Sequence, residues 1–164
     1  MNTELQHVKH PWGPLYDADS EILILGSFPS PKSRETDFFY GHPQNRFWQV
    51  LSQLYDESLP RTIEEKKTLL KKHHVALWDV IDECDIRGAS DASVRGAVPT
   101  KISGLLENSS VRAVYCNGAK SFELYQKYQL KETGVPAVKL PSTSPANAAY
   151  RLPELLKEWI VITK

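Results

Sequence analysis

A chain of 164 residues with 41% hydrophobic and 24% charged side chains has the composition of a soluble globular protein, and we expect one domain over residues 1–164. Its two cysteines are too few for an iron–sulfur cluster or a thiolate metal cage, so we expect no metal and no cofactor. The formal net charge is zero, so a nucleic acid would have to be bound by a local patch and by backbone donors. No apolar run approaches the length of a membrane span and the amino terminus lacks a signal core, which predicts a cytoplasmic protein without a membrane partner.

The amino-terminal third begins with a polar segment, residues 1–20, which we expect to be an extended arm anchored by Trp12. Residues 21–26 then form a short continuous apolar run, which is typical of a buried parallel strand. Residues 27–44 are rich in proline and predict a long irregular loop. Loops of that length in compact domains tend to be functional.

The middle of the chain begins with a helix near Asn45, where apolar residues recur on one face. A second helix is expected over residues 62–73, because Thr62 and Glu65 have the spacing of a capping box. Residues 75–81 predict the next strand. The polar segment 82–99, which contains two glycines, predicts a loop.

The last third repeats this alternation of helices and strands. Helices are expected over residues 100–107, from residue 118 to about 129, and at the carboxyl end around Leu152 and Trp159; strands are expected over residues 111–116 and 136–140. The alternation predicts an α/β fold: a three-layer α/β/α sandwich with a central, mostly parallel sheet of about four strands. Ligands bind such sheets at the carboxyl ends of the strands, where the loops 27–44 and 141–147 emerge.

The first of these loops carries residues suited to binding a base. Ser27 and Ser30 offer small hydrogen-bonding groups, and Phe38, Phe39 and Tyr40 offer flat rings. Asn45 stands where the loop turns into a helix, and its amide both donates and accepts. The alternative is structural: Asn45 as a helix cap, with the aromatic rings in the core.

The residues Gly26-Ser-Phe-Pro-Ser30 and Tyr40-Gly-His-Pro-Gln-Asn-Arg-Phe-Trp48 together resemble the first motif of the uracil-DNA glycosylase superfamily. They are most similar to its hypoxanthine-DNA and mismatch-specific branches. Ser142-Thr-Ser-Pro-Ala-Asn147 occupies the place of the second motif. Phe28 stands where the uracil-excising branch has a water-activating aspartate, and Ser142 stands where relatives often have histidine or asparagine. The hypoxanthine branch has its catalytic asparagine at the position of Asn45.

The resemblance implies a monofunctional DNA glycosylase that flips out a deaminated base, with hypoxanthine as the best guess, and hydrolyses its N-glycosidic bond during base excision repair. Damaged DNA would be the partner of a monomeric enzyme. Asn45 would be the catalytic residue. The residues expected to bind the base are Ser27, Phe28, Phe39 and Tyr40. Those expected to bind DNA are Ser30, Lys32, Ser142, Thr143, Ser144 and Asn147.

Two other functions stay open at this point. One is a uracil or G:T/G:U mismatch glycosylase, and the other is a non-catalytic nucleic-acid-binding module that kept the fold. Outside the motifs, Arg46 is either a phosphate contact or a solvated side chain. Asp79, at the end of the second strand, either binds a base edge or has a structural hydrogen-bonding role.

Overall fold

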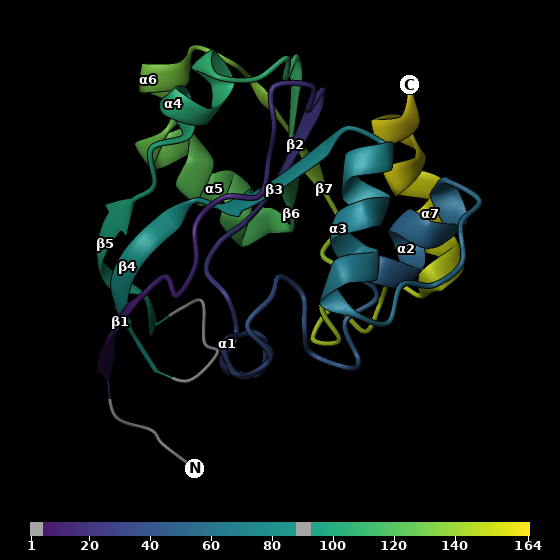
Figure 1. Cartoon of the computed structure of the whole chain (residues 1–164). Helices are drawn as coiled ribbons and strands as arrows, with labels where there is room; N and C mark the ends of the chain where they lie inside the picture. Colours follow the sequence, from purple (N-terminus) through teal and green to yellow (C-terminus); the bar gives the residue numbers. More distant parts are fainter. Residues whose placement is uncertain (1–4, 88–92) are drawn as a thin grey trace.

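The computed structural model describes residues 5–87 and 93–164 (Figure 1). Its strands are β1 (Gln6–Lys9), β2 (Ile22–Gly26), β3 (Val75–Asp79), β4 (Ile81–Ile86), β5 (Arg95–Pro99), β6 (Ala113–Asn117) and β7 (Ala137–Leu140). Its helices are α1 (Pro31–Thr36), α2 (Phe47–Leu54), α3 (Ile63–Lys72), α4 (Ile102–Glu107), α5 (Ala119–Tyr128), α6 (Leu130–Thr133) and α7 (Leu152–Trp159), and a 3-10 turn follows at Ile160–Thr163. Among the described residues, no helix is long and apolar enough to cross a membrane.

The central sheet has four parallel strands in the order β3-β2-β6-β7, which confirms the predicted sheet. All five residues of β2 are buried, because helices cover both faces of this strand. Ile22 and Ile24 face one apolar cluster, whereas Leu23 and Leu25 face another on the opposite side. The three-layer sandwich is therefore confirmed, with one core on each face of the sheet.

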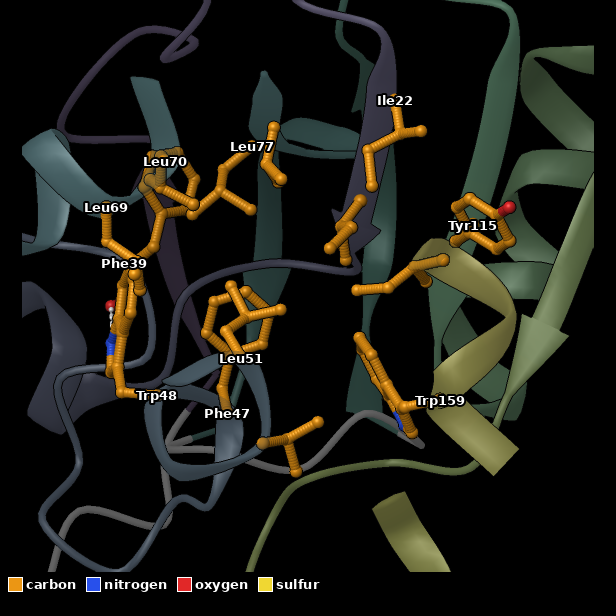
Figure 2. Close-up of a cluster of buried hydrophobic side chains, with 14 of the residues drawn as sticks. Ile22, Phe39, Phe47, Trp48, Leu51, Leu69, Leu70, Leu77, Tyr115 and Trp159 are labelled. Carbon is orange, nitrogen blue, oxygen red and sulfur yellow. Dashed lines mark hydrogen bonds between the residues drawn. The ribbon is translucent and has the colours of Figure 1, made fainter. Parts of the chain in front are cut away.

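The core on one face packs helices α2, α3 and α7 against the sheet (Figure 2). Phe47 and Trp159 are completely buried, and their rings meet edge to face with centroids 6.0 Å apart. The indole N–H of Trp159 donates a hydrogen bond of 2.9 Å to the carbonyl oxygen of Pro141. The carboxyl-terminal helix is thus fixed to the start of the second loop.

The prediction of a loop over residues 82–99 is wrong, because strands β4 and β5 lie in this segment. Residues 88–92 of the segment fall outside the described residues. β4 pairs antiparallel with both β1 and β5 and forms a second, three-stranded sheet. Register shifts along β4 break the simple alternation that marks a strand in a sequence. One of the two strands that pair with β4 is β1, in the amino-terminal arm, and no local sequence pattern predicts so distant a partner.

Two shorter elements add detail to the prediction. Helix α1 lies inside the predicted loop 27–44; it begins with Pro31 after Ser30, whose hydroxyl accepts from the backbone N–H of Ser33. The cap predicted for the helix near residue 62 is confirmed, since the Thr62 hydroxyl accepts from the backbone N–H of Glu65 at 3.1 Å. Short helices of this kind depend on their caps more than on periodicity.

Replacing Trp159 with alanine should lower the free energy of unfolding by about 3–5 kcal/mol, because a large buried side chain leaves a cavity. The change also removes the hydrogen bond that joins α7 to Pro141. Ile160, 47% exposed, is the matched control, and its alanine variant should stay within about 0.5 kcal/mol of the parent. Urea denaturation measures both. Equal losses in the two variants would contradict this account of the core.

Candidate active site

A pocket of about 170 Å³ lies at the carboxyl ends of the parallel strands. Its walls come from segments that are far apart in the sequence: Gly26–Ser30, Phe39, Tyr40 and Asn45, Asp79 at the end of β3, Asn117 at the end of β6, and Ser142–Ser144. A parallel sheet brings the carboxyl ends of its strands to one edge, and polar residues that follow those strands therefore meet there. Both loops singled out in the sequence contribute to this pocket.

Most of the predicted site residues meet in this pocket. The predicted residues that line it are Ser27, Phe28, Ser30, Phe39, Tyr40, Asn45, Ser142, Thr143 and Ser144. Lys32 lies instead on the exposed side of α1, with its ammonium group 3.3 Å from the carboxylate of Glu35. Asn147 lines a neighbouring groove, and its amide donates to the carbonyl oxygen of Ser142.

The amide of Asn45 is oriented by two donors. Its oxygen Oδ1 accepts from the backbone N–H of Phe47 at 2.9 Å and from the Thr143 hydroxyl at 2.8 Å. A backbone N–H can only donate, so the atom facing it must be the amide oxygen. The amide nitrogen Nδ2 is consequently the part of Asn45 that remains for a ligand. Asn45, one residue before the N-cap Arg46, therefore satisfies the first backbone N–H of α2 and is a fixed donor on the pocket wall.

Thr143 connects Asn45 to Asn117. Its side chain is completely buried, and its hydroxyl accepts from Nδ2 of Asn117 at 3.0 Å while donating to Asn45. The backbone N–H of Thr143 donates to Oδ1 of Asn117, also at 3.0 Å. Asn117 was not among the predicted site residues. Its signal was available, since it is a polar residue at the carboxyl end of a buried strand.

Arg46 holds the second loop against the first. Its guanidinium donates to the backbone carbonyl oxygens of Thr143, Ser144, Asn147 and Tyr150. The backbone N–H of Arg46 also donates to Thr143 at 3.1 Å. The planar, multi-donor guanidinium suits such a cluster of carbonyl groups. Arg46 therefore fixes the loop, and its guanidinium is neither simply solvated nor free for phosphate.

The aromatic residues of the first loop divide between core and pocket. Phe38 and Phe39 are buried in the core, and of the two only Phe39 also lines the pocket. One face of the Tyr40 ring packs on Phe47, with centroids 4.0 Å apart. Phe28 is half-buried, and the guanidinium of Arg34 lies 5.8 Å from its ring centroid. Phe28 and Tyr40 are both partly exposed, but Phe47 already covers one face of the Tyr40 ring.

Tyr40 places a buried hydroxyl in the pocket wall. That hydroxyl makes no hydrogen bond of good geometry with the described residues. Burial, and then the negative charge of Asp79, raise the pKa of Tyr40 far above its ordinary value. The hydroxyl therefore keeps its proton and can donate to a ligand.

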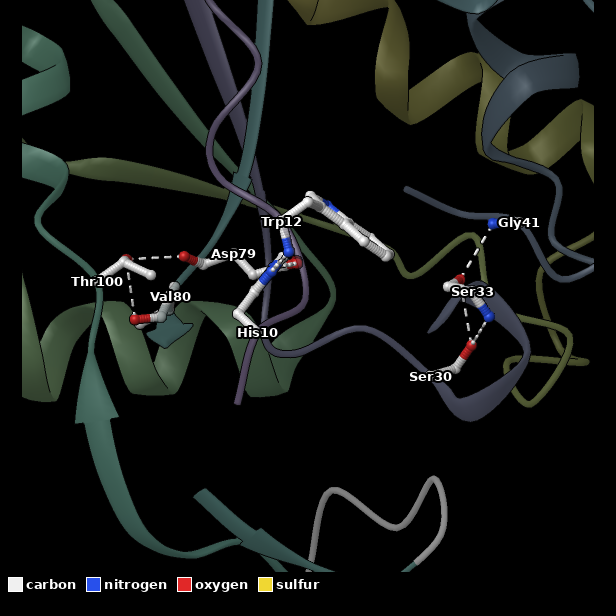
Figure 3. A network of polar contacts seen from close by, with 8 residues as sticks. All are labelled: His10, Trp12, Ser30, Ser33, Gly41, Asp79, Val80 and Thr100. Carbon is white, nitrogen blue, oxygen red and sulfur yellow. Dashed lines mark hydrogen bonds and ion pairs between the residues drawn. The ribbon is translucent and has the colours of Figure 1, made fainter. Parts of the chain in front are cut away.

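Polar contacts around Ser33 and Asp79 stiffen the pocket walls (Figure 3). The Ser33 hydroxyl accepts from the backbone N–H of Gly41 at 3.0 Å and from the Ser30 hydroxyl at 3.2 Å, which ties α1 to the end of its loop. The Thr100 hydroxyl donates to the backbone oxygen of Asp79 at 2.8 Å. Within residues 5–87 and 93–164, no group of three or more His, Cys, Asp or Glu side chains is placed to hold a metal ion.

Replacing Arg46 with lysine should loosen the second loop, because one ammonium group cannot serve four carbonyl oxygens. The free energy of local opening over residues 143–150 should fall by about 1.5–3 kcal/mol, the usual size for hydrogen bonds to a charged group. Amide hydrogen exchange measures this change. Arg151→Lys, at a nearby exposed position, is the control and should leave exchange as it is. Unchanged exchange in Arg46→Lys would mean that the guanidinium does not hold the loop.

Known proteins are similar to this chain in sequence and in fold. A sequence profile of the Uracil DNA glycosylase superfamily matches residues 14–161. A hypoxanthine DNA glycosylase of Methanosarcina acetivorans is 34% identical over 145 residues, which cover 87% of this chain and 90% of that protein. A hypoxanthine DNA glycosylase of Methanosarcina barkeri is 33% identical over 141 residues, with coverage of 85% and 88%.

A solved structure agrees with these relatives. The solution NMR structure of a candidate uracil DNA glycosylase from Methanosarcina acetivorans is 30% identical, and it covers 97% of this chain and 100% of its own. Its TM-score of 0.79 extends the likeness to the whole arrangement of helices and strands. The resemblance first seen in the two motifs is confirmed, and the chain belongs to the uracil DNA glycosylase superfamily.

Proposed function

We propose that this chain is a monofunctional DNA glycosylase of base excision repair that flips a deaminated base out of DNA and hydrolyses its N-glycosidic bond, with hypoxanthine as the preferred base. The observation that carries the proposal is the orientation of Asn45, whose amide nitrogen is left for a ligand in the pocket. The two Methanosarcina relatives, both named hypoxanthine DNA glycosylase, support the choice of base. The enzyme works as one domain, as a monomer in the cytoplasm, without metal or cofactor.

The reaction needs hydrogen-bond donors more than it needs a strong base. Breaking the N-glycosidic bond leaves positive charge on the sugar and negative charge on the departing base. Preorganised donors directed at that negative charge lower the barrier. Asn45 supplies its amide N–H2 group, and the backbone N–H groups around Ser27 and Phe28 supply others. Water then attacks a sugar that is already strongly electrophilic.

The base reaches this pocket only after it leaves the helical stack, which costs a few kcal/mol and costs least for a mispaired base. Phe28, which is half-buried and lines the pocket, stacks on the flipped base. Ser27, Phe39 and Tyr40 complete the walls around the base. The apolar Phe28 supplies no carboxylate for water activation, which makes uracil a poorer substrate than hypoxanthine.

The DNA backbone binds along the second loop. A groove of about 530 Å³ adjoins the pocket, shares Ser142 and Ser144 with it, and continues past Asn147 and Lys139. Hydroxyl and backbone donors of this kind hold phosphates without reading sequence. Ser30 lines the pocket at the start of α1, and Ser30 and its near neighbour Lys32 bind the DNA backbone there. Thr143, buried beneath the loop, holds its backbone in place.

A cleavage panel tests the proposed function. Oligonucleotide duplexes carrying hypoxanthine, uracil, xanthine or a G:T mismatch are incubated with excess protein in a chelator, and abasic sites are revealed with alkali. Hypoxanthine should be released fastest, and strand breaks should appear only after alkali, because the two motifs contain no lysine to form a Schiff base with the sugar. Uracil released as fast as hypoxanthine would overturn the choice of base. Release of no base at all would favour a non-catalytic binding module.

Replacing Asn45 with aspartate tests the amide N–H2 donor separately from the hydrogen bonds that the side-chain oxygen accepts. Aspartate keeps an oxygen for Phe47 and Thr143 but loses the N–H2 donor, so the fold should hold while base release slows by about 10²–10³-fold. Asn45→Ala should be equally slow, and it should also lose about 1 kcal/mol of stability because the hydrogen bonds to Phe47 and Thr143 are lost. Single-turnover kinetics and thermal melts separate these effects. Near-normal release by Asn45→Asp would make Asn45 structural and would move the search to residues 142–147.

A further inference from the structure

Helix α1 places an arginine against one of the rings that line the pocket. The guanidinium carbon of Arg34 lies over the ring of Phe28, 5.8 Å from its centroid. Phe28 lines the pocket, whereas Arg34 is not among the residues that line it. The guanidinium therefore approaches the ring from outside the pocket and leaves the exposed part of the half-buried ring for a ligand.

Arg34 is held in place by the segment that carries it. Its neighbour Ser33 is buried, and the Ser33 hydroxyl accepts from the backbone N–H of Gly41 and from the Ser30 hydroxyl. These contacts fix the short helix α1 against the end of its own loop. The arginine side chain thus starts from a fixed backbone, and a guanidinium over an aromatic ring is attracted to the electrons of that ring.

The guanidinium carries a charge that no described carboxylate neutralises. Nη1 of Arg34 is buried and makes no hydrogen bond of good geometry with the described residues. Arg34 also takes part in none of the ion pairs between described residues. Burial lowers the pKa of Arg34, because desolvation disfavours the charged form, but an arginine stays protonated in a protein. A positive charge without a structural counter-ion in the described part of the chain therefore lies beside the pocket.

The pocket walls themselves offer no such charge to a departing base. Of the described residues that line the pocket, Asp79 alone has a side chain with a formal charge, and that charge is negative. Nε2 of His10 lies 2.7 Å from Oδ2 of Asp79, so this histidine is engaged with the carboxylate (Figure 3). When the N-glycosidic bond breaks, its electron pair leaves with the base, the sugar takes hydroxide from water, and the remaining proton neutralises the base. The anion formed on the way meets donors in the walls, and it meets a cation only behind Phe28.

We propose that Arg34 and Phe28 work as one unit, in which the ring carries the flipped base and the guanidinium behind it stabilises the negative charge that builds on that base. The proposal rests on the glycosylase function proposed above. A base in van der Waals contact with the ring lies on the order of 9–10 Å from the guanidinium carbon. At that distance, with an effective dielectric constant of about 20, a unit positive charge accelerates the formation of a partly developed anion about tenfold. Arg34 touches neither base nor sugar, so it is a positioning residue for Phe28 whose charge acts across the ring.

The acidity of the leaving base separates this role from a structural one. Single-turnover release is measured in one duplex context for hypoxanthine and for 8-azahypoxanthine, whose additional ring nitrogen stabilises the departing anion. Arg34→Gln should slow the release of hypoxanthine about tenfold and that of 8-azahypoxanthine clearly less, because the more stable anion needs less stabilisation from the protein. Arg34→Lys keeps the charge and should retain most of the rate. Equal slowing of both bases in Arg34→Gln, or equally slow Lys and Gln variants, would overturn the proposal.

A double-mutant cycle tests whether the two side chains act together. Phe28→Leu removes the ring on which the base is carried. Adding Arg34→Gln to Phe28→Leu should slow hypoxanthine release much less than the same change slows the parent, because the base is no longer held beside the charge. Losses that multiply in full would contradict a single unit. A thermal melt accompanies each variant, and the ratio of the two release rates is compared within one folded protein.

Arg61→Gln is the matched control, because it removes the same charge from an exposed position outside the pocket. It should leave both release rates as they are. Binding of the lesion duplex is measured at several salt concentrations for both variants. Weaker binding in Arg34→Gln, with a salt dependence reduced by about one phosphate contact and normal release from the bound complex, would make Arg34 a phosphate ligand and overturn the proposal. A parent that releases neither base would overturn the glycosylase function itself.

Discussion

The buried hydrogen bonds of Thr143 are the constraint on which the pocket depends. The Thr143 hydroxyl accepts from Nδ2 of Asn117 and donates to Oδ1 of Asn45. The backbone N–H of Thr143 donates to Oδ1 of Asn117. Buried polar groups must find partners, and these three side chains satisfy one another across residues up to 98 apart in the sequence. Since Oδ1 of Asn45 is committed to this network, its donor nitrogen is what remains for chemistry. Arg46 holds the same loop from outside.

Much of the fold could be predicted because local sequence patterns mark the strands of the central sheet. A continuous apolar run marked the first strand, which is buried on both faces and so needs no alternation, and short, mostly apolar stretches marked the other three. The pocket followed from the same topology, because loops after the first and last of those strands emerge at one edge. Asn45 stood out through its place between a loop and a helix. Its hydrogen bonds to the backbone of Phe47 and to Thr143 are both made by one oxygen atom.

The rest depends on pairings between distant segments. β1, which belongs to the amino-terminal arm, pairs with β4 from a distant part of the chain. Neither strand has a local sequence pattern that predicts it. His10 and Asp79 are 69 residues apart, and a histidine in a polar arm carries no sign that its ring will be buried. Asn117 was visible as the polar end of a strand, but its partner Thr143 was seen only as part of a serine-rich loop. Contacts of this kind can be identified only in the folded structure, where the sheet brings the distant segments together.

The most direct test of the central claim is a crystal structure of the protein bound to a duplex that carries a 2′-fluoro analogue of deoxyinosine, whose glycosidic bond resists cleavage. The account predicts the hypoxanthine ring in the pocket at the carboxyl edge of the central sheet, with Nδ2 of Asn45 within hydrogen-bond distance of the base. A base that stays stacked in the duplex, or that enters another site out of reach of Nδ2 of Asn45, would contradict the account.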